Sequence, residues 1–425
     1  MLLRFEVSNH RSIMQPVELS MIAVDEDRPA ARRFELIAES VLTIAGIYGP
    51  NASGKSNVLE SLAWLSSAVR ASLRQWAETI PREPFKFGHG PYEPSSYVVE
   101  MMVNGVRYSY ELVVDDSSVI SEALYSYPER RPRSLLRREG MDIHLRRGLG
   151  ALSGTRELLT PTTLALSAAM RFDEPEVGDF GRALASIGIL GIRRRFGARR
   201  RFLFGNATEK MFYPAADADQ LSLFSDIEND RLSSREAALD LLRYADLGID
   251  EVQVVEEAGD PSVPSEGRRY LRLMHRVADQ QLPFDMLEES EGTQTWFRLI
   301  GPTVHALRTG QTLLFDEIDA SLHPRLSARL LELFQDPETN PRGAQLVFTT
   351  HDTSLLNHLN RDEVWLTEKG NDGATILTAL AEYGGDKVRR SLNLEKAYLQ
   401  GRFGAVPEFD QAILRRALGL AVKGQ

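Results

Sequence analysis

The sequence lacks cysteine altogether, which excludes disulfide bonds, thiolate zinc sites and cysteine nucleophiles. No stretch approaches the roughly 18 apolar residues that a membrane-spanning helix needs. The first residues, MLLRFEVSNHRSI, alternate apolar and polar side chains and do not form the apolar core of a signal peptide. These absences predict a cytoplasmic protein without a membrane partner.

Positive charge is scarcer than negative charge: 50 basic and 60 acidic residues give a net charge of −10, which argues against a uniformly basic nucleic-acid-binding protein. The arginines nevertheless gather in two clusters. The first consists of Arg130, Arg131, Arg133, Arg137 and Arg138, and the second of Arg193, Arg194, Arg195, Arg199, Arg200 and Arg201. Such runs follow the phosphates of a nucleic acid, form a solvated helix face, or contact an acidic partner. Nucleic acid therefore stays a candidate partner.

The clearest motif is a glycine-rich loop between a predicted strand at residues 41–48 and a predicted helix that begins at Lys55. Its G-x-x-x-x-G-K-S spacing is that of a phosphate-binding loop (P-loop, or Walker A motif). The loop and the residue after it are Gly49, Pro50, Asn51, Ala52, Ser53, Gly54, Lys55, Ser56 and Asn57. Its glycines let backbone N–H groups turn toward phosphates, and the helix start favours the negative charge. Lys55 would bind the β- and γ-phosphates of ATP, and the Ser56 hydroxyl would bind Mg²⁺.

A second predicted strand, residues 312–315, ends in two adjacent acids, as a Walker B strand does. We expect Asp316 to hold Mg²⁺ through its water shell. Glu317 is placed to orient and deprotonate the attacking water. The strand at residues 346–349 leads to His351, which can contact the γ-phosphate and the same water.

Two further segments are candidate nucleotide contacts. The first precedes a predicted helix at residues 296–307, and its residues include Ser290, Gly292, Thr293 and Gln294. A serine and a glycine at a helix start present donors to an anion, although Ser290 could equally be a simple helix N-cap. The second follows the predicted strand at residues 2–7, from which Arg11 either reaches the phosphates or lies in a surface turn.

The rest of the chain predicts an α/β protein whose nucleotide-binding core is interrupted in sequence. Short strands with a hairpin turn at Asn104-Gly105 suggest a β-subdomain before residue 125. From about residue 134 to 247 the pattern favours helices. We therefore expect residues 1–125 and 266–425 to form the two halves of the core, and residues 126–265 to form an inserted, mainly helical lobe.

These motifs, in this order, resemble the AAA-type ATPases that share the cassette-like (ABC-type) core of the SMC, Rad, RecF and OLD families. The resemblance is carried by MLLRFEVSNHRS, GPNASGKS, PFKF, ESEGTQ, LLFDEIDASLHP and FTTHD. The segments RDEVWLTEK and YLQGRFGAVP are similar to the C-termini of ATPases from prokaryotic anti-phage and abortive-infection operons, of the RloA, AbiL and PARIS type.

The resemblance implies an ATP sandwich between two copies, in a homodimer or a larger assembly. The segment starting at Ser290 would be the signature motif that faces the γ-phosphate held by the other copy. Asp319 would lie in the D-loop, whose carboxylate crosses the dimer interface. The family also implies a separate effector, often a Toprim-type or RloB-like nuclease, and a phage protein as trigger. We expect no nuclease site in this chain, because little sequence follows Pro407.

The leading hypothesis is an ATPase that acts as sensor and scaffold in phage defence. One alternative is a RecF-like DNA-maintenance ATPase. A second is an assembly scaffold that needs bound ATP but hardly hydrolyses it.

Overall fold

The computed structural model describes the chain except for residues 35–36, 173, 193–206, 214–230, 246–247, 258–267, 279, 321, 384–392, 406–415 and 419–425. The second arginine cluster lies outside the described residues.

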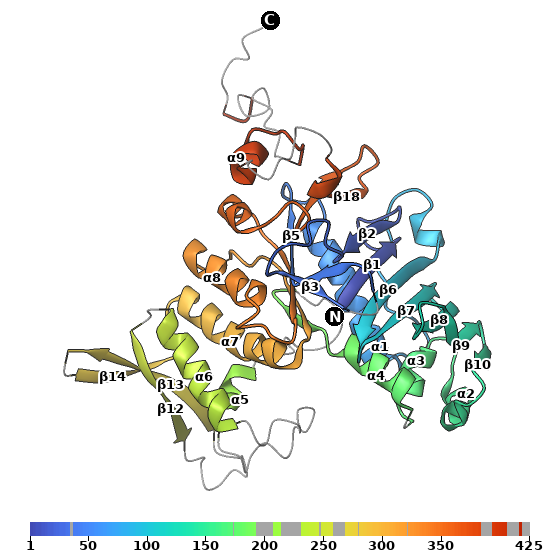
Figure 1. The fold of residues 1–425 in the computed structure, drawn as a ribbon, viewed down its shortest axis with the longest axis horizontal. Coiled ribbons are helices and arrows are strands. Elements are labelled where there is room, and N and C mark those ends of the chain that lie inside the picture. The colour runs from blue at the N-terminus through green and yellow to red at the C-terminus, as the bar shows by residue number, and fades with distance from the viewer. Residues whose placement is uncertain are drawn as a thin grey trace, which may run out of the picture.

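A six-stranded sheet at the centre of the molecule has the strand order β11-β15-β16-β5-β17-β18 (Figure 1). Its strands are β5 (Ile44–Tyr48), β11 (Gly188–Leu190), β15 (Thr312–Phe315), β16 (Gln345–Thr349), β17 (Val364–Lys369) and β18 (Thr375–Ala379). All neighbouring pairs are parallel except β17–β18. The carboxyl ends of β5, β15 and β16 therefore meet at one edge of the sheet, where ligands of such folds bind.

Side chains alternate between the two faces of this central sheet. Leu314 and Val347 join the core that contains α1 (Lys55–Gln75) and a second, antiparallel sheet. Leu313 and Phe348 join the other core, with α7 (Glu291–Thr309) and α8 (Pro324–Gln335). Burial on both faces explains why these strands are nearly continuous apolar runs in the sequence.

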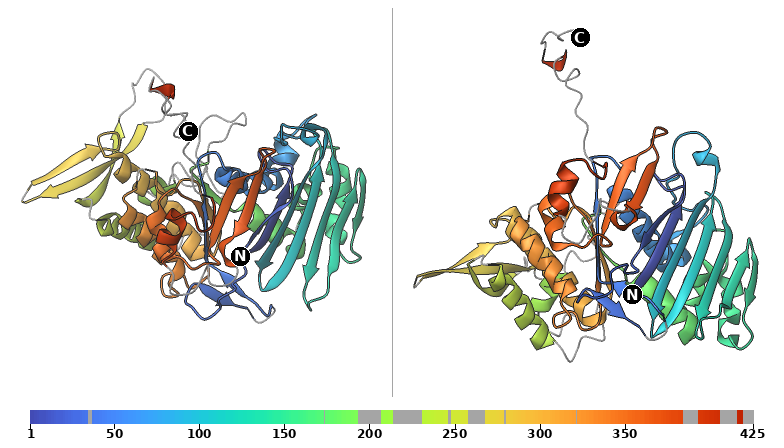
Figure 2. Two further views of the ribbon diagram at one scale, coloured as in Figure 1. Left: turned by 90° about the horizontal axis from the view of Figure 1, so that it is seen from above. Right: turned by 45° about the horizontal axis from the view of Figure 1, so that its top comes forward.

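The antiparallel sheet has seven strands in the order β10-β9-β8-β7-β6-β1-β2, and it forms a layer beside the central sheet (Figure 2). Its strands are β1 (Leu2–Ser8), β2 (Val17–Ser20), β6 (Ser95–Val103), β7 (Val106–Val114), β8 (Val119–Tyr127), β9 (Arg133–Glu139) and β10 (Asp142–Leu145). Trp64 of α1 stacks on Tyr97 of β6 with ring centroids 4.5 Å apart, which fixes the P-loop helix against this sheet.

A smaller three-stranded sheet projects beside α7 (Figure 1). It consists of β12 (Ile249–Glu257), β13 (Arg268–Val277) and β14 (Gln280–Asp285), and a further pair joins β3 (Ala31–Arg33) to β4 (Ser40–Leu42). The remaining α-helices of the described part are α2 (Thr155–Leu158), α3 (Ala165–Ala169), α4 (Pro175–Ala185), α5 (Ala207–Phe212), α6 (Arg231–Tyr244) and α9 (Leu394–Leu399).

Most predicted elements are confirmed, with two corrections. The predicted strand at 41–48 is two strands, because the chain leaves β4 at Leu42 and enters β5 at Ile44. The helical prediction from residue 134 was wrong at β9 and β10. There the register shifts beside Leu124, so that Leu135 and Leu136 are both buried and the period-two pattern is hidden.

The strand β11 also falls within the predicted lobe, yet it pairs with β15 in the central sheet. The boundaries of the inserted lobe at residues 126 and 265 stay a prediction.

Candidate nucleotide-binding site

The glycine-rich loop connects β5 to α1 at the carboxyl edge of the central sheet. Gly49 and Gly54 have φ values of +148° and +112°, and a Cβ at either position would collide with Thr367 or Thr375. Ala52 is also left-handed, with φ +63°. The loop therefore needs a glycine at positions 49 and 54, which lets its backbone turn as a phosphate cradle requires, and it leads into the start of α1.

Lys55 is folded back onto this loop. Its Nζ donates to the carbonyl oxygens of Gly49, at 2.8 Å, and Pro50, at 3.1 Å, and lies 3.5 Å from Nδ1 of His351. Burial lowers the pKa of Lys55 to about 8, although the nearby carboxylates, Asp316 first among them, oppose the shift. Within the described residues, the acceptors of this buried cation within 3.1 Å are the two carbonyl oxygens, which it can exchange for phosphate oxygens.

Ser56 and Asp316 meet across the site, because the Ser56 hydroxyl donates to Asp316 Oδ1 over 2.9 Å. The same oxygen accepts a 2.6 Å hydrogen bond from the Thr349 hydroxyl. Hydroxyl and carboxylate oxygens are the hard ligands that Mg²⁺ prefers, and few protein ligands suffice when phosphates and water complete the shell. The donor set thus fits a nucleotide-bound Mg²⁺ ion.

Glu317 follows β15 in the left-handed conformation, with φ +56°. This conformation is costly for a residue that carries a Cβ, and it persists because the surroundings hold it. Its N–H donates to the Thr349 hydroxyl over 2.8 Å, and the next N–H, of Ile318, donates to the Thr349 carbonyl over 3.0 Å. The sharp turn lets Asp316 and Glu317 take separate positions at the end of one strand.

Asp319 fixes the turn that carries His351. Its carboxylate accepts from the Thr350 hydroxyl at 2.8 Å and from the His351 N–H, with 3.2 Å to each oxygen. In a single chain this carboxylate therefore holds the backbone at His351. The structure places His351 beside Lys55, and its contact with the γ-phosphate stays a prediction.

The segment from Ser290 to Gln294 begins α7. Ser290 is the N-cap, and its Oγ accepts from the Thr293 N–H at 3.1 Å. The Gln294 side chain donates to the Glu289 carbonyl at 3.0 Å. A helix N-cap and an anion-binding residue both lie at a helix N-terminus. The observed hydrogen bond of Ser290 is therefore compatible with either role.

Arg11 is held by carboxylates in this structure. Its guanidinium pairs with Glu60 and with Glu83, the latter at 2.9 Å, while its N–H donates to the Glu83 carbonyl at 2.6 Å. A phosphate contact would require the side chain to leave these acids.

Sequence reasoning missed the residues that brace the P-loop from behind. The Thr367 hydroxyl lies 2.5 Å from Ser53 Oγ and donates to the Tyr48 carbonyl, and the Thr375 hydroxyl donates to the Ser53 carbonyl at 2.8 Å. Both threonines lie in the β17–β18 hairpin. Thr367 follows the apolar run Val364 to Leu366, and a threonine at the end of such a run is a weak sequence signal; Thr375 begins β18 and carries no such signal.

The first arginine cluster is not a uniform surface. Arg131, Arg133 and Arg137 are exposed, whereas Arg138 is buried and donates to the carbonyls of Gly140 and Thr163. The prediction that Arg138 belongs to a basic surface was therefore wrong, because its guanidinium donates to backbone carbonyls inside the fold.

The central sheet, the P-loop and the acids after β15 define an ABC-type P-loop ATPase fold. A family model described as "AAA domain, putative AbiEii toxin, Type IV TA system" matches residues 44–357, which is most of the chain. The protein belongs to this family, and so to the AAA/ABC-type ATPases linked with abortive infection and toxin–antitoxin systems.

Among solved structures, the chain is similar to the SMC head bound to the C-winged helix domain of ScpA. The identity is 14% and the TM-score 0.47, over 89% of this chain and 97% of that one. No curated protein matches the sequence. Within the described residues, no helix is both long and apolar enough to cross a membrane.

Proposed function

We propose that this chain binds ATP with Mg²⁺ at the P-loop, hydrolyses it, and serves as the sensor and scaffold subunit of an anti-phage defence system. The observation that carries the proposal is the meeting of Ser56, Asp316 and Lys55 with His351 at one sheet edge, joined by the contacts described above. Three segments far apart in the sequence, around Lys55, Asp316 and His351, are needed to build it. A glycine turn without a ligand would not require them to converge.

Each residue has a separate task in this proposal. Lys55 binds the β- and γ-phosphates, and Ser56 and Asp316 hold Mg²⁺, which neutralises phosphate charge when bound. Glu317 orients the attacking water and accepts its proton. His351, held by Asp319, contacts the γ-phosphate.

The proposed active form is a homodimer or larger homo-oligomer in which each ATP lies between two copies. Ser290, Gly292, Thr293 and Gln294 then face the γ-phosphate bound to the partner's loop. Because a ligand shifts a conformational equilibrium only through its different affinity for the two states, these γ-phosphate contacts must differ before and after hydrolysis. Membership in a family linked with toxin–antitoxin systems supports a separate effector, which we propose to be a nuclease, and a phage protein as trigger.

Steady-state hydrolysis and nucleotide binding test the catalytic assignment. Glu317→Gln should bind ATP yet hydrolyse it about 10²–10⁴-fold more slowly, because the general base is lost. Lys55→Ala should lose binding. The matched control is Glu338→Gln, a change of the same chemistry at an exposed position after α8. Turnover at the wild-type rate by Glu317→Gln would overturn the assignment of the general base. Tight ATP binding by Lys55→Ala would overturn the assignment of the phosphate-binding lysine.

The same variants separate the alternatives. Full defence by Glu317→Gln together with its effector would favour an ATP-bound scaffold with little turnover. DNA-stimulated hydrolysis that disappears when Arg131, Arg133 and Arg137 are changed to serine would favour a DNA-maintenance ATPase, since these side chains are exposed.

A further inference from the structure

Three loops converge on one side of the first turn of α1. The first carries Ser12, whose hydroxyl accepts a hydrogen bond from Asn57 Nδ2 and lies 2.7 Å from Thr375 Oγ1. The second, after α1, is joined to the first by the Arg11 N–H, which donates to the Glu83 carbonyl. The third is the turn between β17 and β18 with Thr375 directly after it, whose N–H donates to the Ser12 carbonyl at 2.6 Å. Together they form a wall beside the P-loop.

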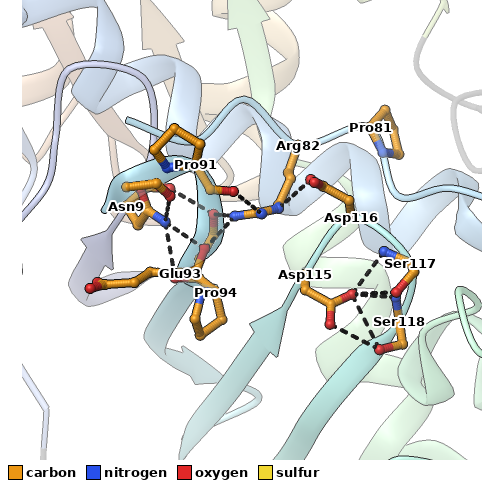
Figure 3. A network of polar contacts seen from close by, with 12 residues as sticks. Asn9, Pro81, Arg82, Pro91, Glu93, Pro94, Asp115, Asp116, Ser117 and Ser118 are labelled. Carbon is orange, nitrogen blue, oxygen red and sulfur yellow. Dashed lines mark hydrogen bonds and ion pairs between the residues drawn. The ribbon is translucent and has the colours of Figure 1, made fainter. Parts of the chain in front are cut away.

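The second loop, residues 81–94, is held by two buried side chains, those of Asn9 and Arg82 (Figure 3). Asn9 Nδ2 donates to the carbonyls of Gly90 and Glu93, at 2.8 and 2.7 Å, and Asn9 Oδ1 accepts from the Phe85 N–H. Arg82 pairs with Asp116 at 2.6 Å and also donates to the Glu93 carbonyl. Loops whose backbone is fixed in this way keep the side chains they carry in one place.

Phe87 lies on this rigid loop, with 66% of its surface exposed. Its ring makes an edge contact with Phe85, with centroids 5.5 Å apart, and a Cβ at Gly373 would lie 4.0 Å from Phe87 Cε2. The ring is therefore supported from behind by Phe85 and lies next to the β17–β18 turn. A large aromatic surface left open to water on a fixed support is suited to stacking against a flat ligand.

The expected orientation of a bound nucleotide also places its nucleoside toward the loop of Phe87. Lys55 marks the end of the loop that binds the β- and γ-phosphates, and Glu317 and His351 lie at that end too. The nucleoside must leave the loop on the other side. Asn57, one residue beyond Ser56, contacts Ser12 of the wall, so this side of α1 leads toward the loop of Phe87.

We propose that the Phe87 ring is the platform on which the purine base of the nucleotide stacks. This assignment rests on the proposed function, because it extends the same phosphate site to the base. The wall then holds the nucleoside, while Ser56 and Asp316 hold the phosphate end. In this proposal the motif PFKF, residues 84–87, supplies the base-stacking ring, a role that the sequence alone did not suggest.

Calorimetric titration of the full-length chain with Mg²⁺-ADP and with Mg²⁺-pyrophosphate tests the proposal, because the two ligands share their phosphates and differ in the nucleoside. Phe87→Ala should weaken ADP binding by roughly 5- to 150-fold, the range of a lost base–aromatic stack. Pyrophosphate binding should not change. Phe87→Tyr should retain ADP affinity. Tyr92→Ala is the matched control, since this ring lies on the same loop and is 89% exposed.

A spectroscopic test uses Phe87→Trp, whose added indole fluorescence should be quenched by ADP and not by pyrophosphate. Unchanged ADP affinity in Phe87→Ala would overturn the platform, and so would an equal loss for both ligands, which would mean that Phe87 only shapes the loop. An effector-binding defect with normal ADP affinity would assign the ring to protein docking instead. If Lys55→Ala binds neither ADP nor pyrophosphate while Phe87→Ala binds both normally, the base platform is refuted and the proposed function is not. A wild-type chain that binds neither ligand would refute both.

Discussion

The Thr349 hydroxyl donates a 2.6 Å hydrogen bond to Asp316 Oδ1 while accepting one from the N–H of Glu317, the next residue along. One buried side chain at the end of β16 thereby fixes both acids at the end of β15. Since β15 and β16 pair in parallel, with Phe315 opposite Phe348, this relationship follows from the register of the sheet.

We predict that Thr349→Val, which keeps the shape but removes the hydroxyl, lowers kcat for ATP by about 10- to 100-fold, the usual cost of losing a residue that orients a ligand or a metal-binding acid. The KM for ATP should change little, because Lys55 is untouched. Thr349→Ser should restore most of kcat. Thr303→Val is the matched control, since the buried Thr303 hydroxyl has no hydrogen-bond partner in the described structure. Equal kcat values for Thr349→Val and the wild type would contradict the assignment.

Nucleotide affinity should depend on pH through Lys55. Burial lowers its pKa to about 8 in the free protein, and a bound phosphate would favour the charged form. Below pH 8 the ammonium is already present, whereas above it binding must take up a proton. The Kd for ADP should therefore rise by up to about tenfold per pH unit between pH 8 and 9.5.

Lys55→Arg provides the comparison, because its guanidinium stays charged throughout this range. Binding by this variant, even if weaker, should be flat with pH in calorimetric titrations. A wild-type Kd that is equally flat would show that the free lysine does not titrate there.

The shared ATP site can be tested by mixing two inactive variants. Ser290→Asp keeps a good helix N-cap but brings a negative charge to the γ-phosphate, and Ser290→Asn keeps the cap without the charge. Only Ser290→Asp should abolish hydrolysis. Mixed with Lys55→Ala, it should recover about a quarter of wild-type activity, because half of the dimers are mixed and each contains one intact composite site.

No recovery on mixing, with both variants folded and exchanging subunits by native mass spectrometry, would place the whole site within one chain. Hydrolysis by Ser290→Asp at the wild-type rate would leave Ser290 as a structural cap alone.

Stability should depend on pH through Glu363, which lies before β17 and is 1% exposed. Burial raises its pKa to about 7, although Arg28 opposes the shift through an ion pair of 3.1 Å. A carboxyl whose folded-state pKa is raised stabilises the fold below its unfolded pKa and loses this contribution as pH rises to about 7. The free energy of unfolding should fall by up to about 1.4 kcal/mol per pH unit across this window.

Glu363→Gln should remove that slope, whereas the exposed Glu338→Gln should keep it. Thermal or urea unfolding at pH 5, 6, 7 and 8 measures the difference between the variants. Parallel pH profiles for the wild type and Glu363→Gln would show that the carboxyl does not titrate in this range.

The site residues that the sequence could predict lie within a few residues of the carboxyl end of a strand. Gly49 to Ser56 carry a fixed spacing with a backbone reason for each glycine. Asp316 and His351 follow short apolar runs of the kind that a buried parallel strand produces. These patterns are local, because strand, loop and helix geometry is set by neighbours in the chain.

The sequence by itself thus determined a P-loop ATPase core and named the residues that we propose to bind its phosphates. Only the tertiary structure decided what holds and extends that site: Thr349 on the two acids, the β17–β18 hairpin behind the P-loop, Arg138 inside the fold, and Phe87 beside Gly373. Each of these contacts joins segments that are distant in sequence, and hydrogen bonds and packing between such segments follow from strand order and register, which no local pattern of residues encodes.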